Sequence, residues 1–311
     1  MNETITQSNI SAITQQAAEI IDPSAELVYG IDSHEFNGME GNMIESLLLE
    51  GEQAIPDRAV EEIHQEIPTN SATLLVDDTT SRFSSALWYE EIQRKVIILA
   101  GVGGIGSFVG FLLARMKPNA LFIYDDDSVE ASNMSGQLYS QSDIGISKVL
   151  ALTRMISEYA NYNSVFAIND KFTYESEPSD IMICGFDNMK ARSIFFHKWM
   201  EYVYNKSIEE RKNCLFIDGR LAAEEFQILC VRGDDEYNIN RYRDKFLFSD
   251  EEADETICSY KQTTFCANMI ASYMVNLFVN FCANQCNPLI DRSLPFLSIY
   301  NAETMYFKTE A

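Results

Sequence analysis

The sequence predicts an α/β domain built on a doubly wound, mostly parallel sheet with antiparallel edge strands, preceded by an acidic N-terminal extension. Three observations predict this fold class. Residues 96–100 (VIILA) are a short apolar run rich in β-branched side chains, which is typical of a strand buried on both faces. A glycine-rich turn and a segment with helical spacing of apolar residues, 107–116, follow directly. Strand-like and helix-like segments then alternate up to about residue 217, and antiparallel pieces follow.

The glycine-rich turn is the first candidate binding site. It contains Gly101, Gly103, Gly104 and Gly106. A strand, a glycine turn and a helix together aim backbone N–H groups and a helix N-terminus at a phosphate. Asp125 follows about twenty residues later, after the strand-like residues 122–124, where a carboxylate can bond a ribose hydroxyl. This spacing favours a nucleotide site over the alternative, a tight structural turn.

The other elements are expected in chain order. We expect a short edge strand at 73–76, an amphipathic helix at 82–93, helices at 144–159 and from 189 to about 204, and strands at 165–168, 180–184 and 214–217. We expect an antiparallel strand at 226–231, an irregular charged crossover at 233–255, and closing strands at 296–300 and 304–307. Residues 263–282 are apolar nearly all round, which predicts a buried helix.

Charge and composition exclude several classes of function. The 47 acidic and 23 basic residues give a net charge of −24, which argues against a nucleic-acid surface. No run approaches eighteen unbroken apolar residues, so no membrane span is expected. The N-terminus lacks a basic start and an apolar centre, so it does not predict a secretory signal. The seven cysteines follow no disulfide spacing and are expected to be reduced thiols in a cytoplasmic protein.

Residues 1–80 form the expected acidic extension, and residues 81–311 the expected folded domain. The extension holds sixteen acidic residues and one basic residue, Arg58, so it carries about −15 of the total charge. This composition predicts a loosely docked or poorly ordered segment, and the alternative is a partner-binding arm.

From about residue 82 to residue 280 the chain resembles the ThiF/MoeB/ubiquitin-activating superfamily of adenylyltransferases, whose domain is Rossmann-like. Five motifs carry this resemblance in the family's order: GVGGIG at 101–106; the run from Asp125 to Asn133 with Gln137 after it; D-I-G-x-x-K ending at Lys148; Asp187-Asn188 with Arg192; and Asp218-Gly219-Arg220. The glycine motif alone is a weak signal, whereas five ordered motifs make chance agreement improbable.

The resemblance implies ATP-dependent activation of a carboxylate, such as the C-terminal glycine of a ubiquitin-like or sulfur-carrier protein. Transfer of AMP turns the carboxylate into an acyl adenylate with a good leaving group. In the implied site the glycines admit the phosphates and Asp125 holds the ribose. Asn133 and Lys148 contact the phosphates, and Asp187 holds Mg²⁺. The implied nucleotide-binding set also includes Asp127, Gln137 and Asn188. Asp127 has an alternative as part of a solvated turn. A homodimer or heterodimer is implied as well.

Two departures from the family pattern concern phosphate-binding arginines. The family usually has an arginine where this chain has Gly136, and a second one where it has Ser85. Either another cation substitutes, with Arg82, Arg94 and Arg115 as candidates, or ATP turnover is impaired. The second possibility describes a non-catalytic nucleotide-binding scaffold or half of a heterodimer. A third alternative is an NAD-dependent oxidoreductase, because GVGGIG also satisfies the dinucleotide fingerprint, although Lys148 has no task in hydride transfer.

Cysteine chemistry offers one candidate. Cys258 follows the acidic crossover, and Lys261 nearby would favour its thiolate, so it is a candidate nucleophile with a plain loop thiol as the alternative. A structural zinc is not expected, because Cys282 and Cys286 have no second cysteine pair.

Overall fold

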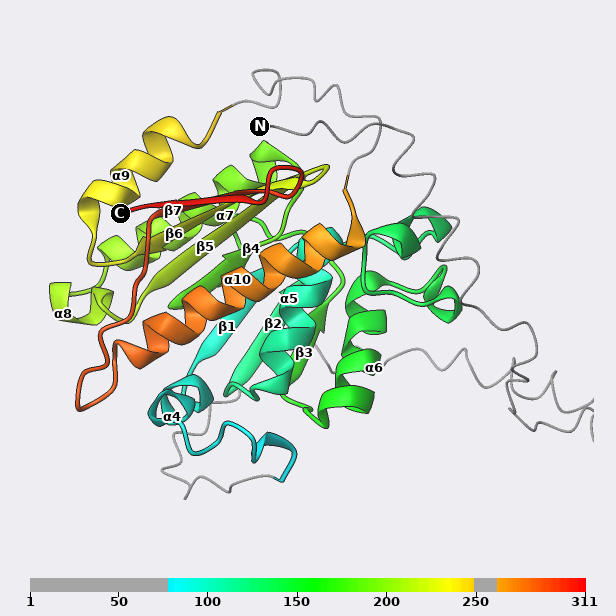
Figure 1. Ribbon diagram of the computed structural model, residues 1–311, viewed down its shortest axis with the longest axis horizontal. Helices are drawn as coiled ribbons and strands as arrows, with labels where there is room; N and C mark the ends of the chain where they lie inside the picture. The colour runs from blue at the N-terminus through cyan, green and yellow to red at the C-terminus, as the bar shows by residue number, and fades with distance from the viewer. Residues whose placement is uncertain (1–77, 249–261) are drawn as a thin grey trace, which may run out of the picture. The chain divides into compact units, whose positions relative to one another are not determined.

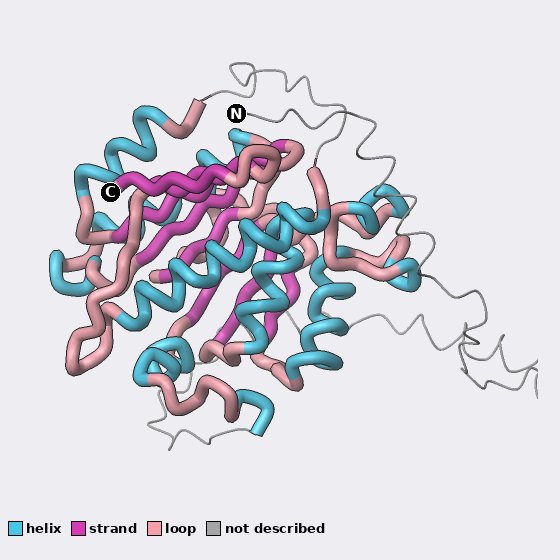
Figure 2. Tube along the Cα trace, viewed as in Figure 1, coloured by secondary structure: helices cyan, strands magenta, loops and turns pink. Residues whose placement is uncertain are grey.

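The computed structural model describes residues 78–248 and 262–311, which form one eight-stranded sheet with helices on both faces (Figures 1 and 2). The parallel strands are β1 (Val96–Ala100), β2 (Ala120–Tyr124), β3 (Val165–Ile168), β4 (Ile181–Cys184) and β5 (Leu215–Ala222), and the antiparallel ones are β6 (Glu225–Arg232), β7 (Leu297–Asn301) and β8 (Tyr306–Glu310). Their order across the sheet is β3-β2-β1-β4-β5-β6-β7-β8. The predicted fold class, a doubly wound, mostly parallel sheet with an antiparallel edge, is confirmed.

The helices divide between the two faces of the sheet. They are α4 (Leu87–Gln93), α5 (Gly104–Arg115), α6 (Lys148–Ala160), α7 (Met189–Tyr204), α8 (Ile208–Arg211), α9 (Glu236–Lys245) and α10 (Thr264–Ala283). In Figure 1, α5, α6 and α10 lie in front of the strands and α7 lies behind them. Alternation along β1 explains this division. Ile97 and Leu99 belong to the core under α5, α6 and α10, whereas Ile98 and Ala100 belong to the core with α7 and α9.

Among the described residues, α10 alone has the length and apolar composition of a membrane span, with a mean hydropathy of 1.4. However, 61% of this apolar window is buried inside the domain. The helix packs against α5, α4 and the strands β5 and β6. It is therefore the buried core helix that the sequence predicts at 263–282.

Two boundaries differ from the prediction in ways that matter for the site. The helix expected from residue 144 begins at Lys148, because Gly145 has a left-handed φ of +86° and a short 3₁₀ turn, Gln141–Asp143, precedes it. The strand expected to end at residue 217 runs on to Ala222, because Asp218 and its successors pair with β6. Asp218-Gly219-Arg220 therefore lies inside a strand and not in a loop.

Two other predictions were wrong in part. The helix expected from Arg82 begins only at Leu87, which is 59% exposed, and α4 buries Tyr89 and Ile92. The crossover expected to be irregular contains α9, whose N-terminus is capped by the Asp235 carboxylate accepting the Asn238 N–H at 3.0 Å. The strand expected at 73–76 lies outside the described residues, and the domain boundary at residue 80 stays a prediction.

Candidate active site

The glycine-rich turn joins β1 to α5 as the sequence predicts. Gly101 has a left-handed φ of +81°, and a Cβ there would lie 2.7 Å from the carbonyl carbon of Gly185. A side chain on Gly106 would meet the carbonyl of Gly101. Both positions therefore need glycine, the first for its conformation and for close packing against the end of β4. The first N–H groups of α5 are left without partners inside the helix, which makes this end a place for an anion.

Asp125, at the end of β2, holds the glycine turn in position. Its carboxylate accepts the Val102 N–H at 2.8 Å and the Asp127 N–H at 3.0 Å, and its side chain is only 9% exposed. Burial raises the pKa of this carboxyl, while the Lys148 ammonium and the two N–H groups act in the opposite direction. A carboxylate accepts several hydrogen bonds, so this arrangement leaves capacity for a ribose hydroxyl. The bond to Val102 is a positioning role that sequence reasoning missed.

Lys148 completes what we call the lysine cluster, made of Lys148, Asp125 and Asp127. Its Nζ lies 2.7 Å from the Asp127 carboxylate and 4.0 Å from that of Asp125, and only 8% of its side chain is exposed. Tyr139 ties the base of Lys148 to the glycine turn, because its hydroxyl lies 2.6 Å from the Val102 carbonyl and 3.4 Å from the Lys148 carbonyl. The structure thus brings an ammonium, two carboxylates and the glycine turn together.

Asp187 and Asn188 follow β4, beside the same turn. Gly185 donates its N–H to the Ala100 carbonyl at 2.8 Å, so the chain that leads to Asp187 starts next to Gly101. Asn188 caps α7 by accepting the Ala191 N–H at 2.8 Å, and its Nδ2 donates to the Asp187 carboxylate at 3.4 Å. The Asp187 side chain is exposed and pairs with no basic side chain among the described residues. Its carboxylate is therefore available to an added cation.

A second cluster, which we call the arginine cluster, contacts the loop that carries Asp187. It consists of Asp218 with Arg192, Arg220 and Tyr242. Asp218 is fully buried and forms ion pairs with Arg192 and with Arg220 at 2.8 Å, and Tyr242 donates its hydroxyl at 2.9 Å. Burial acts to lower the pKa of Arg220, but the Asp218 carboxylate and the Tyr242 hydroxyl together outweigh it and the net direction is upward.

Arg192 also donates to the carbonyl of Phe186, the residue before Asp187, and to that of Gly219 at 3.1 Å. The sequence motifs around Arg192 and Asp218 are therefore one buried ion-pair cluster that fixes α7, α9 and the loop carrying Asp187. The guanidinium of Arg192 is buried and is engaged by Asp218 and by two backbone carbonyls of its own chain.

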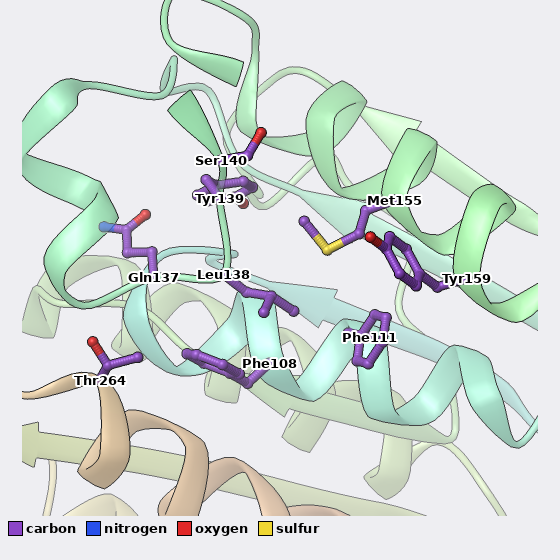
Figure 3. A pocket seen from close by; sticks show the side chains of 9 residues that line it. All are labelled: Phe108, Phe111, Gln137, Leu138, Tyr139, Ser140, Met155, Tyr159 and Thr264. Carbon is purple, nitrogen blue, oxygen red and sulfur yellow. The ribbon is translucent and has the colours of Figure 1, made fainter. Parts of the chain in front are cut away.

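Asn133 and Gln137 lie in the segment that crosses above α5. The Asn133 side-chain oxygen accepts the Glu130 N–H at 2.9 Å, so it orders a 3₁₀ turn, Ala131–Ser135. Gln137 lies beside Gly103, with its Nε2 3.8 Å from the place of a Cβ there, and its Oε1 is buried without a hydrogen-bond partner. Gln137 also contributes to a mostly apolar pocket of about 360 Å³ between α5 and α6 (Figure 3).

Two of the three arginines considered as substitutes, Arg94 and Arg115, lie at the ends of β1 and α5 that are opposite to the glycine turn. Arg115 is the last residue of α5, roughly 16 Å along the helix from its first turn at about 1.5 Å per residue. Arg94 precedes β1 and pairs with Glu91 at 2.6 Å, whereas the glycine turn follows the other end of that strand. Neither reaches the glycine turn of its own chain. Arg82 is exposed and precedes α4.

The cysteines of the described residues give no nucleophile. All six are free and buried, and burial raises the pKa of Cys214, Cys230 and Cys282 to about 12. No group of three histidine, cysteine or acidic side chains within residues 78–248 and 262–311 is arranged to hold a metal. Cys258 lies outside the described residues, and its role stays a prediction.

The sheet order, the glycine turn and the clustered polar ends of β1, β2 and β4 define a Rossmann-like α/β domain with a candidate anion site at the topological switch between β1 and β4. The family model for the ThiF family matches residues 77–307. The chain belongs to the ThiF family.

Curated relatives match only part of the chain. Ubiquitin-like modifier-activating enzyme 5 from Drosophila virilis is 33% identical over 121 residues, which cover 33% of this chain and 30% of that protein. The same enzyme from Drosophila melanogaster is 31% identical over a stretch of the same length. The chain thus spans about 30% of the length of the curated relatives it matches.

Solved structures share the fold at low sequence identity. PaaA has a TM-score of 0.58 at 15% identity, with 100% of this chain and 91% of that chain covered. MccB from E. coli, solved with ATP, has a TM-score of 0.53 at 13% identity, with 76% and 72% covered. These neighbours support the architecture only.

Proposed function

We propose that this chain is an ATP-dependent adenylyltransferase that activates a carboxylate. A carboxylate oxygen of the acyl substrate attacks the α-phosphorus of ATP, the bond from that phosphorus to the pyrophosphate oxygen breaks, and an acyl adenylate and pyrophosphate form. Such a displacement needs positioning and charge neutralisation more than covalent help from the protein. The ThiF family supports this reaction class, and the lysine cluster supplies the chemistry within the chain.

The observation that carries the proposal is the placement of Lys148. Its ammonium is nearly buried beside the glycine turn, yet its closest partner, Asp127, is 66% exposed. Because the Asp127 carboxylate keeps most of its contact with water, water can replace its bond to Lys148, and the ammonium can then pair with a phosphate oxygen. Asp125 lies 4.0 Å from the same ammonium. The backbone N–H groups at the start of α5 would bind the same phosphates.

Asp187 fits the role proposed for a Mg²⁺ ligand. Its carboxylate is exposed and has no basic partner among the described residues, and the two residues before it, Gly185 and Phe186, pack against Gly101. Mg²⁺ in nucleotide sites typically takes one or two protein carboxylates together with phosphate oxygens. A bound Mg²⁺ would neutralise charge on the phosphates, and Arg192 would keep Asp187 in place through the carbonyl of Phe186.

The acyl substrate we propose is the C-terminal carboxylate of a ubiquitin-like or sulfur-carrier protein. The names of the curated relatives support this substrate class. Low-identity neighbours include MccB solved together with forms of MccA, so a peptide carboxylate is the nearest variant of the proposal. We also propose a dimer and a cytoplasmic location, both from the family resemblance and composition.

A second candidate function is a non-catalytic nucleotide-binding partner within a heterodimer. The observation that favours it is the absence of both family arginines: Gly136 stands in one place and Ser85 in the other. An NAD-dependent oxidoreductase has no such support, because the lysine cluster serves no step of hydride transfer.

ATP–pyrophosphate exchange tests the enzyme proposal. The full chain is incubated with ATP, Mg²⁺, labelled pyrophosphate and candidate small proteins that end in Gly-Gly. Exchange that depends on the carrier's free C-terminus supports adenylation. ATP binding by calorimetry without any exchange would favour the non-catalytic candidate, and NAD binding with no ATP binding would contradict both.

A further inference from the structure

Gln262 is a polar side chain that neither the motifs nor the family resemblance singles out. It comes just before α10, and an isolated parallel bridge to Ala223 places its backbone. Its side chain lies over the first turn of α5, where a Cβ built on Gly104 would stand only 2.7 Å from its Cδ. The glutamine amide thus fills the space directly above the helix N-terminus that is expected to receive phosphates.

The same amide fills the space left by the missing arginine. A Cβ on Gly136 would lie 2.6 Å from the Nε2 of Gln262, and this nitrogen donates a long hydrogen bond of 3.4 Å to the Gly136 carbonyl. Thr264 fastens the neighbouring backbone by donating its hydroxyl to Ser135. Gly136 and Gln262 are therefore sterically coupled, because a side chain at position 136 needs the volume that Gln262 now occupies.

Unused hydrogen-bonding groups gather at this place. The long bond to Gly136 is the one hydrogen bond of the Gln262 side chain within the described residues, although an amide offers two donors and an acceptor. Gln137 Oε1 is buried without a partner, and Figure 3 shows Gln137 and Thr264 at the same end of the pocket. Buried polar atoms are normally paired, so unpaired ones beside a helix N-terminus point to a polar ligand.

We propose that Gln262 is a phosphate-contacting residue that replaces the arginine absent at Gly136. Its free N–H would donate to a phosphate oxygen of the bound ATP, and Gln137 beside Gly103 would orient it or share this role. The inference rests on the proposed ATP-dependent function and adds a specific residue to it. Because an amide is neutral, Lys148 would be the one cation from this part of the described chain that meets the phosphates.

Calorimetric titration of the full chain with ATP·Mg²⁺ and with adenosine tests this inference. We expect Gln262→Ala to weaken ATP binding about tenfold, the usual worth of one hydrogen bond to a charged group, and to leave adenosine binding within about twofold. Gln262→Glu should weaken ATP binding more, most of all at low salt, because it removes the donor and adds a negative charge. Gln227→Ala, an exposed glutamine on β6, is the matched control and should change neither titration.

The steric coupling supplies a second measurement. Gly136→Arg alone should weaken ATP binding because the new side chain meets Gln262. Adding Gln262→Ala to Gly136→Arg should recover the affinity, since the arginine can then enter the vacated space. Thermal unfolding of each variant identifies any that fails to fold, and the remaining variants still decide the question.

The possible outcomes distinguish a failure of this inference from a failure of the proposed ATP-dependent function. If the unaltered chain binds no ATP, both are overturned. If the unaltered chain binds ATP and the Gln262→Ala variant binds ATP equally well or more tightly, only the inference is overturned. Gln262 would then only cover the N-terminus of α5. An equal loss for ATP and adenosine would show a packing role and would likewise overturn it.

Discussion

Two clusters within residues 78–248 bring basic side chains and carboxylates together near the carboxyl ends of the parallel strands. They differ in how far the carboxylate is enclosed. In the arginine cluster Asp218 is fully buried and is paired with Arg192, Arg220 and Tyr242. In the lysine cluster Lys148 is nearly buried, with 8% of its side chain exposed, but its partner Asp127 is 66% exposed.

This difference in burial indicates which cluster stabilises the fold and which can bind an anion. A buried ion pair with every hydrogen bond made cannot exchange partners without leaving a charge in a low-dielectric interior. An ion pair with one exposed partner can exchange it for a ligand at little cost. We therefore infer that the arginine cluster fixes the elements around the site, and that the lysine cluster changes its ion pairs when an anion binds.

Breaking the arginine cluster should have the largest effect. Asp218→Asn leaves the buried guanidinium of Arg192 and the partly buried one of Arg220 without a counter-charge, so the free energy of unfolding should fall by about 3–5 kcal/mol. Urea unfolding followed by circular dichroism measures this loss. Asp234→Asn is the control, because its partner Arg232 is 46% exposed and the loss there should stay below about 1 kcal/mol. Equal losses in the two variants would remove the distinction between the clusters.

Removing the ammonium of the lysine cluster should affect activity more than folding. Lys148→Met keeps the apolar stem, so we expect ATP–pyrophosphate exchange to fall by about 10²–10³-fold, as for other groups that stabilise transition-state charge. The unfolding free energy should change far less than for Asp218→Asn. Lys171→Met is the control, because Lys171 is 72% exposed and pairs at 3.4 Å with the half-exposed Asp126. Unchanged exchange in Lys148→Met would show that the site assignment is wrong.

The sequence predicted the parts of the molecule that local patterns control. The apolar run of β1, the glycine turn and the alternation of strands and helices depend on neighbours in the chain, so they were predictable. The start of α6 was predicted four residues too early, because the left-handed Gly145 is not distinguishable from a helical glycine by spacing alone. The α9 cap by Asp235 was a local signal that charge content obscured.

Contacts between residues that are far apart in the chain could not be predicted from the sequence. Arg192 and Asp218 are 26 residues apart, and only the packing of α7 on β5 shows that they neutralise each other. Gln262 meets Gly104 and Gly136 from more than a hundred residues away, so no motif pointed to it. The resemblance to the ThiF family supplied the order of the motifs, but not which of them are structural.

A pH titration sharpens the description of the lysine cluster. Burial raises the pKa of Asp125 above its ordinary value of 3.8, so the folded state holds this proton more tightly than the unfolded state does. The contribution of Asp125 to stability is therefore highest below pH 3.8 and falls as the pH rises through the folded-state pKa.

Asp125→Asn removes this titration. The stability of the variant relative to the unaltered chain should rise between pH 4 and pH 7, by about 1.4 kcal/mol for each pH unit that separates the pKa of Asp125 in the folded state from that in the unfolded state. Urea unfolding at several pH values measures the trend. A flat or falling difference would mean that the charges around Asp125, and not its burial, dominate.

The smallest effect is expected at the exposed partner of Lys148. Asp127→Asn keeps the shape of the side chain and removes its charge, and Asp125 remains as a counter-charge 4.0 Å from the ammonium, so the unfolding free energy should change less than in Asp218→Asn. Because Asp127 competes with phosphate for the ammonium, ATP should bind the variant as tightly as the unaltered chain or more tightly. Calorimetry with ATP·Mg²⁺ measures this. A marked loss of ATP affinity would mean that Asp127 binds the nucleotide or its metal directly. The hypothesis that Lys148 exchanges Asp127 for a phosphate oxygen would then be wrong.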